Sequence, residues 1–357
     1  MPVKKAVLTL IKIATSYAGA VIGAGFASGQ EIMQFFVSYG QSGIAGAFLS
    51  TLLFAYTGGL VMYLAAVTGS RNYLLLYEKL LGKWGRYIMD ILSLSMLLGG
   101  LFVMTAGGAA IFAEKFGLPG IIGSLSVALA VAVVLTGGLE GVLTSNIIFV
   151  PVKLLAVSFI SLSSLSAAGW TIPAAAGNSC GAPGGHWLIS AFLYVSYNTV
   201  APAAVLSSLG VAVPVKLAVA GGFLGGTLIG GAVLLETLAL LAHMPSAAGY
   251  QVPLLYLAEG LGAGPGFLAG ILIWLAVFTS AVADAHGFSI RLAPFTGTRY
   301  RIFGLGACAA AIPVAGLGFS YLVGHLYPLF GYAGSALLAS LILFPLFPAR
   351  HRTGKFK

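Results

Sequence analysis

The chain has few charged residues and few cysteines. Only 7% of its 357 residues are Asp, Glu, Lys or Arg, whereas a soluble domain carries about a quarter. This shortage excludes a large soluble domain. The cysteines are Cys180 and Cys308, which we place in a loop and inside an apolar segment, so we expect no disulfide between them.

Metal and catalytic signatures are also missing. The five histidines are scattered without ligand spacing, and no HExxH, paired-cysteine, P-loop or nucleophile-elbow pattern occurs. We therefore expect no enzyme, no cofactor and no firm metal site. The net charge of +9 does not predict nucleic-acid binding, because the basic residues lie in separate short segments. No pattern predicts an oligomeric state.

Apolar residues and glycine are abundant instead. The chain is 59% hydrophobic, contains 50 glycines and has a mean hydropathy of +1.03, and its apolar runs reach the roughly 20 residues that a helix needs to cross a bilayer. This predicts an all-α integral membrane protein with ten transmembrane helices. The predicted spans are residues 7–37, 43–67, 87–113, 119–137, 142–167, 187–209, 214–242, 266–290, 302–323 and 326–347.

The positions of the basic residues predict the orientation. With the N-terminus in the cytoplasm, all 17 Lys and Arg residues fall on the inner side except Lys115, which lies outside, and Lys153, which lies within a span. The positive-inside rule therefore predicts a multi-pass protein of the cell membrane with both termini cytoplasmic. The N-terminus resembles a signal peptide, but Lys12 interrupts its apolar core, and we expect it to be retained.

Ten spans divide into two sets of five. An odd number per set means that a repeated fold would be threaded in opposite directions, as in the inverted repeats of many secondary transporters. We expect a first repeat over 1–170, a second over 186–348 and a basic cytoplasmic tail over 349–357. Weak internal similarity supports this, because the Leu-Leu-Tyr at 75–77 returns at 254–256.

Spans one and six are predicted to be discontinuous. In lipid a helix can be broken only where its freed backbone groups line a cavity or touch a ligand. The first span carries Gly23 and Gly25 near its middle, followed by Phe26, and the sixth carries Tyr197-Asn198-Thr199 before Pro202. These segments are the candidate binding site. The alternatives are a glycine packing face in span one and a simple proline kink in span six.

The stretch Ile22-Gly23-Ala24-Gly25-Phe26 resembles the IGxGxF signature of the amino acid, polyamine and organocation transporter superfamily, whose members have the LeuT-type fold. The longer GAVIGAGFASGQEI is similar to YkvI-type membrane proteins. The resemblance implies that the Ala24 and Gly25 amides cradle a substrate carboxylate. A half-helix beginning near Ala27 would add its positive dipole end. The expected substrate-binding residues are Gly23, Ala24, Gly25, Phe26, Tyr197, Asn198 and Thr199.

The sequence supports two interpretations of how transport is coupled to an ion. Thr279 and Ser280 resemble the hydroxyl pair of a sodium site, which the carbonyls of Gly19 and Ile22 would complete. Lys153 lies deep in a span and resembles the lysine whose ammonium replaces sodium in sodium-independent relatives. A desolvated lysine has a readily shifted pKa, which would allow proton coupling. We favour the lysine, with those same oxygens as its acceptors, over ordinary packing of the hydroxyls and snorkelling of the lysine.

Carboxylates within spans are rare. Glu31, just beyond the first break, is a candidate gate or proton carrier, whereas we expect Glu236 to be interfacial and Asp284 to join His286 and Arg291 in a charge cluster at the inner surface. A glycine-rich segment is predicted to pack closely against other helices. Its glycines are Gly221, Gly222, Gly225, Gly226, Gly230 and Gly231.

These features predict a secondary transporter that moves a small amino acid, or a related carboxylate-bearing or zwitterionic solute, by alternating access. We expect proton coupling or sodium independence. The alternatives are a sodium-coupled symporter that uses Thr279 and Ser280, and a ligand-sensing receptor subunit with the same fold. The expected partners are a small-molecule solute and the lipid bilayer.

Overall fold

The computed structural model describes residues 3–69, 72–137, 140–173, 182–294 and 297–346, without the side chains of 137–148. All regular elements in these ranges are helices. The helices are α1 (Val3–Val21), α2 (Ala24–Ala27), α3 (Gln30–Phe35), η1 (Val37–Tyr39), α4 (Gln41–Thr68), α5 (Tyr73–Phe116), α6 (Gly120–Gly137), α7 (Glu140–Ala167), α8 (Trp187–Val200), α9 (Pro202–Gly210), α10 (Val215–Ala242), η2 (Ser246–Gly249), α11 (Pro253–Gly260), α12 (Ala263–Leu292), α13 (Thr298–Ala315), α14 (Phe319–Leu343) and η3 (Phe344–Leu346). Cys308 is buried, and Cys180 lies outside the described residues.

Several of these helices are long and apolar enough to cross a membrane. Within the described residues there are six of them, namely α4, α5, α7 from Phe149 onward, α10, α12 and α14, and the bent pair α8 and α9 makes a seventh. The protein is therefore a multi-pass membrane protein. The count of ten spans, the inverted repeat and the division at 170 and 186 stay predictions.

One predicted boundary is wrong. The ninth and tenth spans meet at Gly316–Gly318, not near residue 324, because Gly318 adopts a positive φ of 93° that ends the turn between α13 and α14. Apolar patterning alone did not place this turn at the right glycine. The third predicted span lies within α5, and the non-helical Gly82, with φ 77° and ψ 179°, kinks this helix before the span begins at residue 87.

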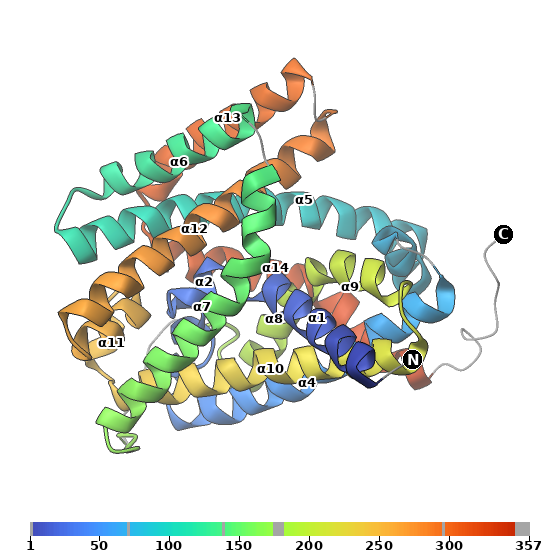
Figure 1. Ribbon diagram of the computed structural model, residues 1–357, viewed down its shortest axis with the longest axis horizontal. Coiled ribbons are helices and arrows are strands. Elements are labelled where there is room, and N and C mark those ends of the chain that lie inside the picture. The colour runs from blue at the N-terminus through green and yellow to red at the C-terminus, as the bar shows by residue number, and fades with distance from the viewer. Residues whose placement is uncertain (1–2, 70–71, 138–139, 174–181, 295–296, 347–357) are drawn as a thin grey trace.

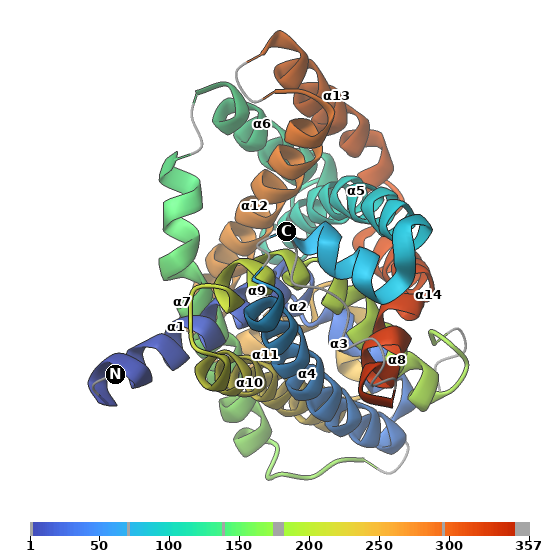
Figure 2. The same cartoon turned by 90° about the vertical axis from the view of Figure 1, so that its right-hand side faces the viewer.

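The helices form two groups. In the first, α4 packs along α10, and α1, α8 and α9 pack against these two. In the second, α5, α6, α12 and α13 pack on one another. Both views place α6 and α13 at one edge of the molecule and α4 and α10 at the opposite edge (Figures 1 and 2). Helix α14 contacts both α8 of the first group and α5 of the second.

The glycines of α10 hold the first group together, as predicted. A Cβ atom on Gly222 would lie 2.3 Å from the carbonyl oxygen of Gly58 in α4, and one on Gly226 would lie 2.2 Å from that of Phe54. On the α1 side, a Cβ on Gly221 would come within 2.8 Å of Ile13. Close backbone approach of this kind is how small residues let membrane helices associate. Gly231 is the exception, with nothing within 4 Å.

Candidate functional site

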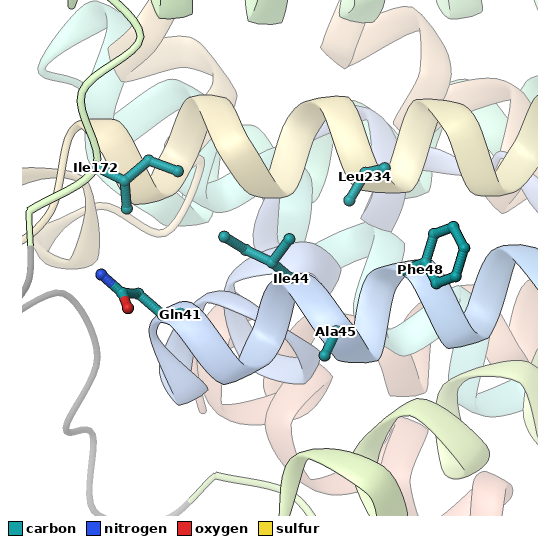
Figure 3. A pocket seen from close by; sticks show the side chains of 6 residues that line it. All are labelled: Gln41, Ile44, Ala45, Phe48, Ile172 and Leu234. Carbon is teal, nitrogen blue, oxygen red and sulfur yellow. The ribbon is translucent and has the colours of Figure 1, made fainter.

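Two cavities differ sharply in their chemistry. One, of about 560 Å³, lies between α4 and α10 and is lined by Ile44, Ala45, Phe48, Ile172 and Leu234, with Gln41 as the only polar side chain (Figure 3). The other, of about 840 Å³, lies between the two helix groups and is lined by the α1–α2 break together with α5, α7, α8, α9, α12 and α14. Only the second contains ionisable side chains, so it is the candidate site.

The first predicted span is interrupted, as predicted. Helix α1 ends at Val21 and α2 begins at Ala24, with Gly23 in an extended conformation between them. Helix α2 has only four residues, and a second interruption follows at Gly29, where φ is 82°. The expectation of a half-helix beginning near Ala27 is therefore wrong. Because the macrodipole needs several aligned turns, a four-residue helix offers little of the expected positive end.

The carboxylate of Glu31 folds back onto this break. The Tyr197 hydroxyl donates a hydrogen bond to Glu31 Oε2 at 2.5 Å, and the backbone amide of Phe26 also donates to this carboxylate. A Cβ atom on Gly25 would lie only 2.0 Å from Glu31 Oε1, so glycine is required there for the contact. In the folded protein, therefore, the break, Glu31 and Tyr197 form one connected group.

The other predicted binding residues divide between lining and packing roles. Gly23, Ala24, Gly25, Tyr197 and Asn198 line the cavity. Phe26 is fully buried in the core, and Thr199 donates to the Val195 carbonyl oxygen at 2.7 Å within its own helix. Neither Phe26 nor Thr199 is a lining residue of this cavity.

Span six does not unwind at Asn198, which corrects the expectation. Tyr197, Asn198 and Thr199 all lie within α8, and the helix axis bends by 56° where α9 begins at Pro202. Proline lacks the amide that would bond to the carbonyl four residues earlier, here that of Asn198, but its φ suits the first turn of a helix. The chain therefore bends at the proline while the residues before it remain helical.

The predicted ion-site residues all line the cavity. Gly19, Ile22, Lys153, Thr279 and Ser280 are brought together there by α1, α7 and α12. Ser280 faces the break, with its Oγ 3.9 Å from the Cβ position of Gly23, whereas Thr279 donates to the Ala276 carbonyl oxygen of its own helix at 3.2 Å.

Lys153 lacks the partners expected for it. Its side chain is 6% exposed and reaches a region beside Ala27 and Ile273. It forms no hydrogen bond or ion pair with any residue in the described part of the chain, including the predicted acceptors Thr279 and Ser280. The ammonium is therefore a buried cation whose charge is balanced by no side chain that the structure describes.

Asp284 is a lining residue of the cavity, a position that the sequence did not predict. The expected cluster with His286 and Arg291 does not form. Arg291 pairs with Asp90 Oδ1 at 3.1 Å and donates to the Tyr73 hydroxyl, while His286 contacts the Tyr300 hydroxyl at 2.8 Å. The spacing could have revealed the position, since Ser280 and Asp284 are one helical turn apart and share a face of α12.

Glu236 is fully buried, which corrects the expectation that it is interfacial. Its side chain is 0% exposed, and neither carboxylate oxygen has a hydrogen-bond partner among the described residues. Glu236 lies close to Gly29, where a Cβ atom would lie 3.3 Å from Glu236 Oε1. No sequence signal distinguished this depth from the interface, because Glu236 follows two leucines in an evenly apolar helix.

Relatives in sequence cover nearly the whole chain. YyaD of Bacillus subtilis (strain 168) is 32% identical over 338 residues, which are 92% of this chain and 94% of that protein. The membrane protein YkvI of the same organism is 28% identical over 341 residues, or 93% and 94% of the two chains. No family model matches the chain.

Solved structures give the fold. MhsT, solved in complex with L-phenylalanine, superposes with a TM-score of 0.58 at 17% identity over 93% of this chain and 88% of that one. The manganese transporter of Eremococcus coleocola gives 0.58 at 16% identity over 97% and 78%. At 17% and 16% identity, these two likenesses give the fold of the chain. The chain has a LeuT-type fold and belongs to the family of YkvI and YyaD.

Proposed function

We propose that the protein is a secondary active transporter that moves a small amino acid, or a related carboxylate-bearing or zwitterionic solute, across the cell membrane by alternating access. The observation that carries the proposal is the 840 Å³ cavity, where the broken first span meets Tyr197, Asn198 and Lys153. Backbone groups can be left free at membrane depth only where a cavity or ligand satisfies them. Membership of a LeuT-type family supports the same reading.

The exposed side chain of Arg291, near the end of α12, is one of the cavity's lining residues. The lining residues run from Glu31 to Tyr73 and Arg291, at the end that positive-inside orientation assigns to the cytoplasm. Beyond Glu31 the helices are joined by polar contacts. The Ser190 hydroxyl donates to the Phe35 carbonyl oxygen at 2.7 Å, and the Leu254 amide donates to the Ser28 carbonyl oxygen at 2.9 Å. We interpret this conformation as inward-facing.

The outer end has a second set of contacts between α5 and the segment around α11. Glu114 accepts hydrogen bonds from the amides of Gln251 at 2.6 Å and Val252 at 3.1 Å, and Lys115 pairs with Glu259 at 2.8 Å. Alternating access would require these contacts to open when the cytoplasmic end closes. Alternate opening of the two ends would expose the one central site to each side of the membrane in turn, as transport requires.

We propose that transport is coupled to a proton, or that Lys153 makes transport independent of sodium. Lys153 supplies a buried cation in the cavity that the break lines, and Glu31 is a carboxylate that reaches the same cavity. A fixed ammonium would take the place of sodium and remove the need for it. One observation favours the sodium alternative: Ser280 Oγ lies against Gly23, where oxygen ligands could meet a hard cation.

The test begins with a thermal-shift screen of amino acids, amines and small carboxylates, run with and without sodium at several pH values. The compounds that stabilise the protein are then assayed for uptake into proteoliposomes. We expect sodium-independent uptake by the parent protein and loss of uptake in Lys153→Ala. Strict sodium dependence would replace the coupling assignment by the sodium alternative, and binding without flux would refute transport.

A further inference from the structure

We propose that Asp284 binds the cationic group of the transported solute, so that the cavity selects compounds carrying an amine. This inference rests on the proposed function, since it specifies the solute class of the same cavity. Asp284 is placed on α12, one turn inward of Ser280, and no sequence pattern had assigned it to the site.

Asp284 forms no hydrogen bond and no ion pair with any residue that the structure describes, although it lies at membrane depth. A carboxylate in such surroundings needs a counter-charge or donors. Among the other acidic groups, Glu31 accepts from Tyr197 and Asp90 pairs with Arg291. Glu236 also lacks a partner among the described residues, but it is not a lining residue of this cavity.

The Asp284 carboxylate fits a space that a glycine of α5 leaves open. A Cβ atom on Gly100 of α5 would lie 2.4 Å from Asp284 Oδ2 and 3.3 Å from Oδ1, so the missing side chain at Gly100 makes room for it. The neighbouring Ala283 is exposed to the cavity. Asp284 is therefore positioned by packing against backbone and is accessible to a solute.

The cavity is lined by charged side chains of both signs. Its ionisable side chains are Glu31, Lys153, Asp284 and Arg291, together with Tyr73, Tyr197 and Tyr327. Glu31 and Arg291 have partners, which leaves one free anion on α12 and one free cation, Lys153, on α7 among the described residues. The two do not pair with each other, so a dipolar solute can complement both.

Distance along the helix is compatible with a small solute. Asp284 follows Ser280 by four residues, a rise of about 6 Å along the axis, and Ser280 lies against Gly23 at the break. A solute whose carboxylate lies near the break or Lys153 could therefore place an amine at Asp284. Deaminated acids would leave the Asp284 charge without a partner, whereas amines would neutralise it.

The first experiment needs no known ligand. Ala283→Cys is introduced in a background with Cys180→Ala and Cys308→Ala, and its modification by cationic and anionic methanethiosulfonate reagents is compared with Asp284 intact and in Asp284→Asn. We expect the cationic reagent to react at least about tenfold faster relative to the anionic one when Asp284 is present, and this preference to fall in Asp284→Asn. A reagent preference unchanged by Asp284→Asn would overturn the proposal.

The second experiment compares probes. Each amino acid is tested for binding beside its decarboxylated amine and its deaminated acid, in the parent protein, in Asp284→Asn and in the carboxylate-to-amide control Glu78→Gln. Glu78 is not a lining residue of the cavity and pairs with Arg86. We expect amine-bearing probes to lose at least about tenfold in affinity in Asp284→Asn only. Gly100→Ala, which displaces the carboxylate, should have the same effect.

The outcomes separate this inference from the proposed function. Amine binding that depends on Asp284 without flux would retain the inference and refute transport. Flux with deaminated acids preferred, or with Asp284→Asn unaffected, would refute the inference and retain transport. No binding of any amine-bearing probe, or stabilisation by sodium ions alone, would also refute it. Size-exclusion profiles of both variants show whether they fold.

Discussion

The two interrupted membrane segments are broken by different means. Around Gly23 the chain leaves the helix, and a second interruption follows at Gly29 with φ 82°. At Pro202 the chain stays helical on both sides and only the axis turns, by 56°. Glycine permits conformations that free backbone groups, whereas proline removes one amide and redirects the helix.

The two segments therefore contribute to the candidate site in different ways. The first exposes main chain to the cavity and holds the Glu31 carboxylate against Gly25. The second supplies the side chains of Tyr197 and Asn198 from an intact helix, followed by a bend. The comparison predicts that changes at the first segment affect the site more strongly than changes at the second.

The largest effect is expected for Glu31→Gln. The variant removes the charged acceptor of Tyr197 and of the Phe26 amide, and hydrogen bonds to charged groups contribute about 1.5–3 kcal/mol. We expect uptake to fall by about a hundredfold. The measurements are uptake into proteoliposomes and the unfolding midpoint, with Glu78→Gln, a change outside the cavity lining, as the control. A double-mutant cycle with Tyr197→Phe measures the coupling, and additivity of the two changes would show that the contact contributes nothing.

A smaller loss is expected for Gly25→Ala. The added Cβ would lie 2.0 Å from Glu31 Oε1 and must displace that flexible side chain. We expect uptake to fall by about tenfold, with little change in the yield of folded protein. Gly231→Ala in α10 is the matched control, because nothing lies within 4 Å of its Cβ position. Equal behaviour of the two variants would show that the Gly25–Glu31 contact does not matter.

Pro202→Ala is expected to act more weakly. The alanine amide can bond to the Asn198 carbonyl, so the bend between α8 and α9 should decrease. We expect about a threefold slower uptake without a loss of stability. Distances between spin labels at the outer end of α8 and the inner end of α9 report the bend. If these distances stay unchanged, neighbouring helices rather than proline set the angle.

Thr199→Val should have the smallest effect. The Thr199 hydroxyl bonds only to the Val195 carbonyl of its own helix and lies outside the cavity lining. We expect stability to change by less than about 0.5 kcal/mol and uptake to be unchanged. A tenfold loss of uptake would place Thr199 in contact with the solute and would erase the contrast between the two segments.

The sequence predicted those features that depend on local chemistry. Glycines within an apolar run located the first break, and Pro202 located the bend in span six. The glycine face of α10 was predicted from spacing because close packing needs small residues at helical intervals. The prediction failed at Asn198, since a proline affects the carbonyl four residues earlier without unwinding the residues between.

Depth and neighbours could not be read from the chain alone. Glu236 and Asp284 were placed by counting residues from span ends, but their burial depends on which helices cover them. The return of Glu31 to Gly25 depends on the turn at Gly29, and the isolation of Lys153 depends on where α7 lies against α12. Each is a tertiary property that no periodicity in one segment encodes.

The backbone contacts between α10 and α4 have a mechanical consequence. Helices that touch through Gly222 and Gly58, with no side chains between them, have little freedom to slide or separate. The first helix group should therefore turn as one stiff unit against the second. Because the cavity lies along the boundary of these units, a small rotation would widen one end of the cavity while narrowing the other. The same residues would line the central site throughout.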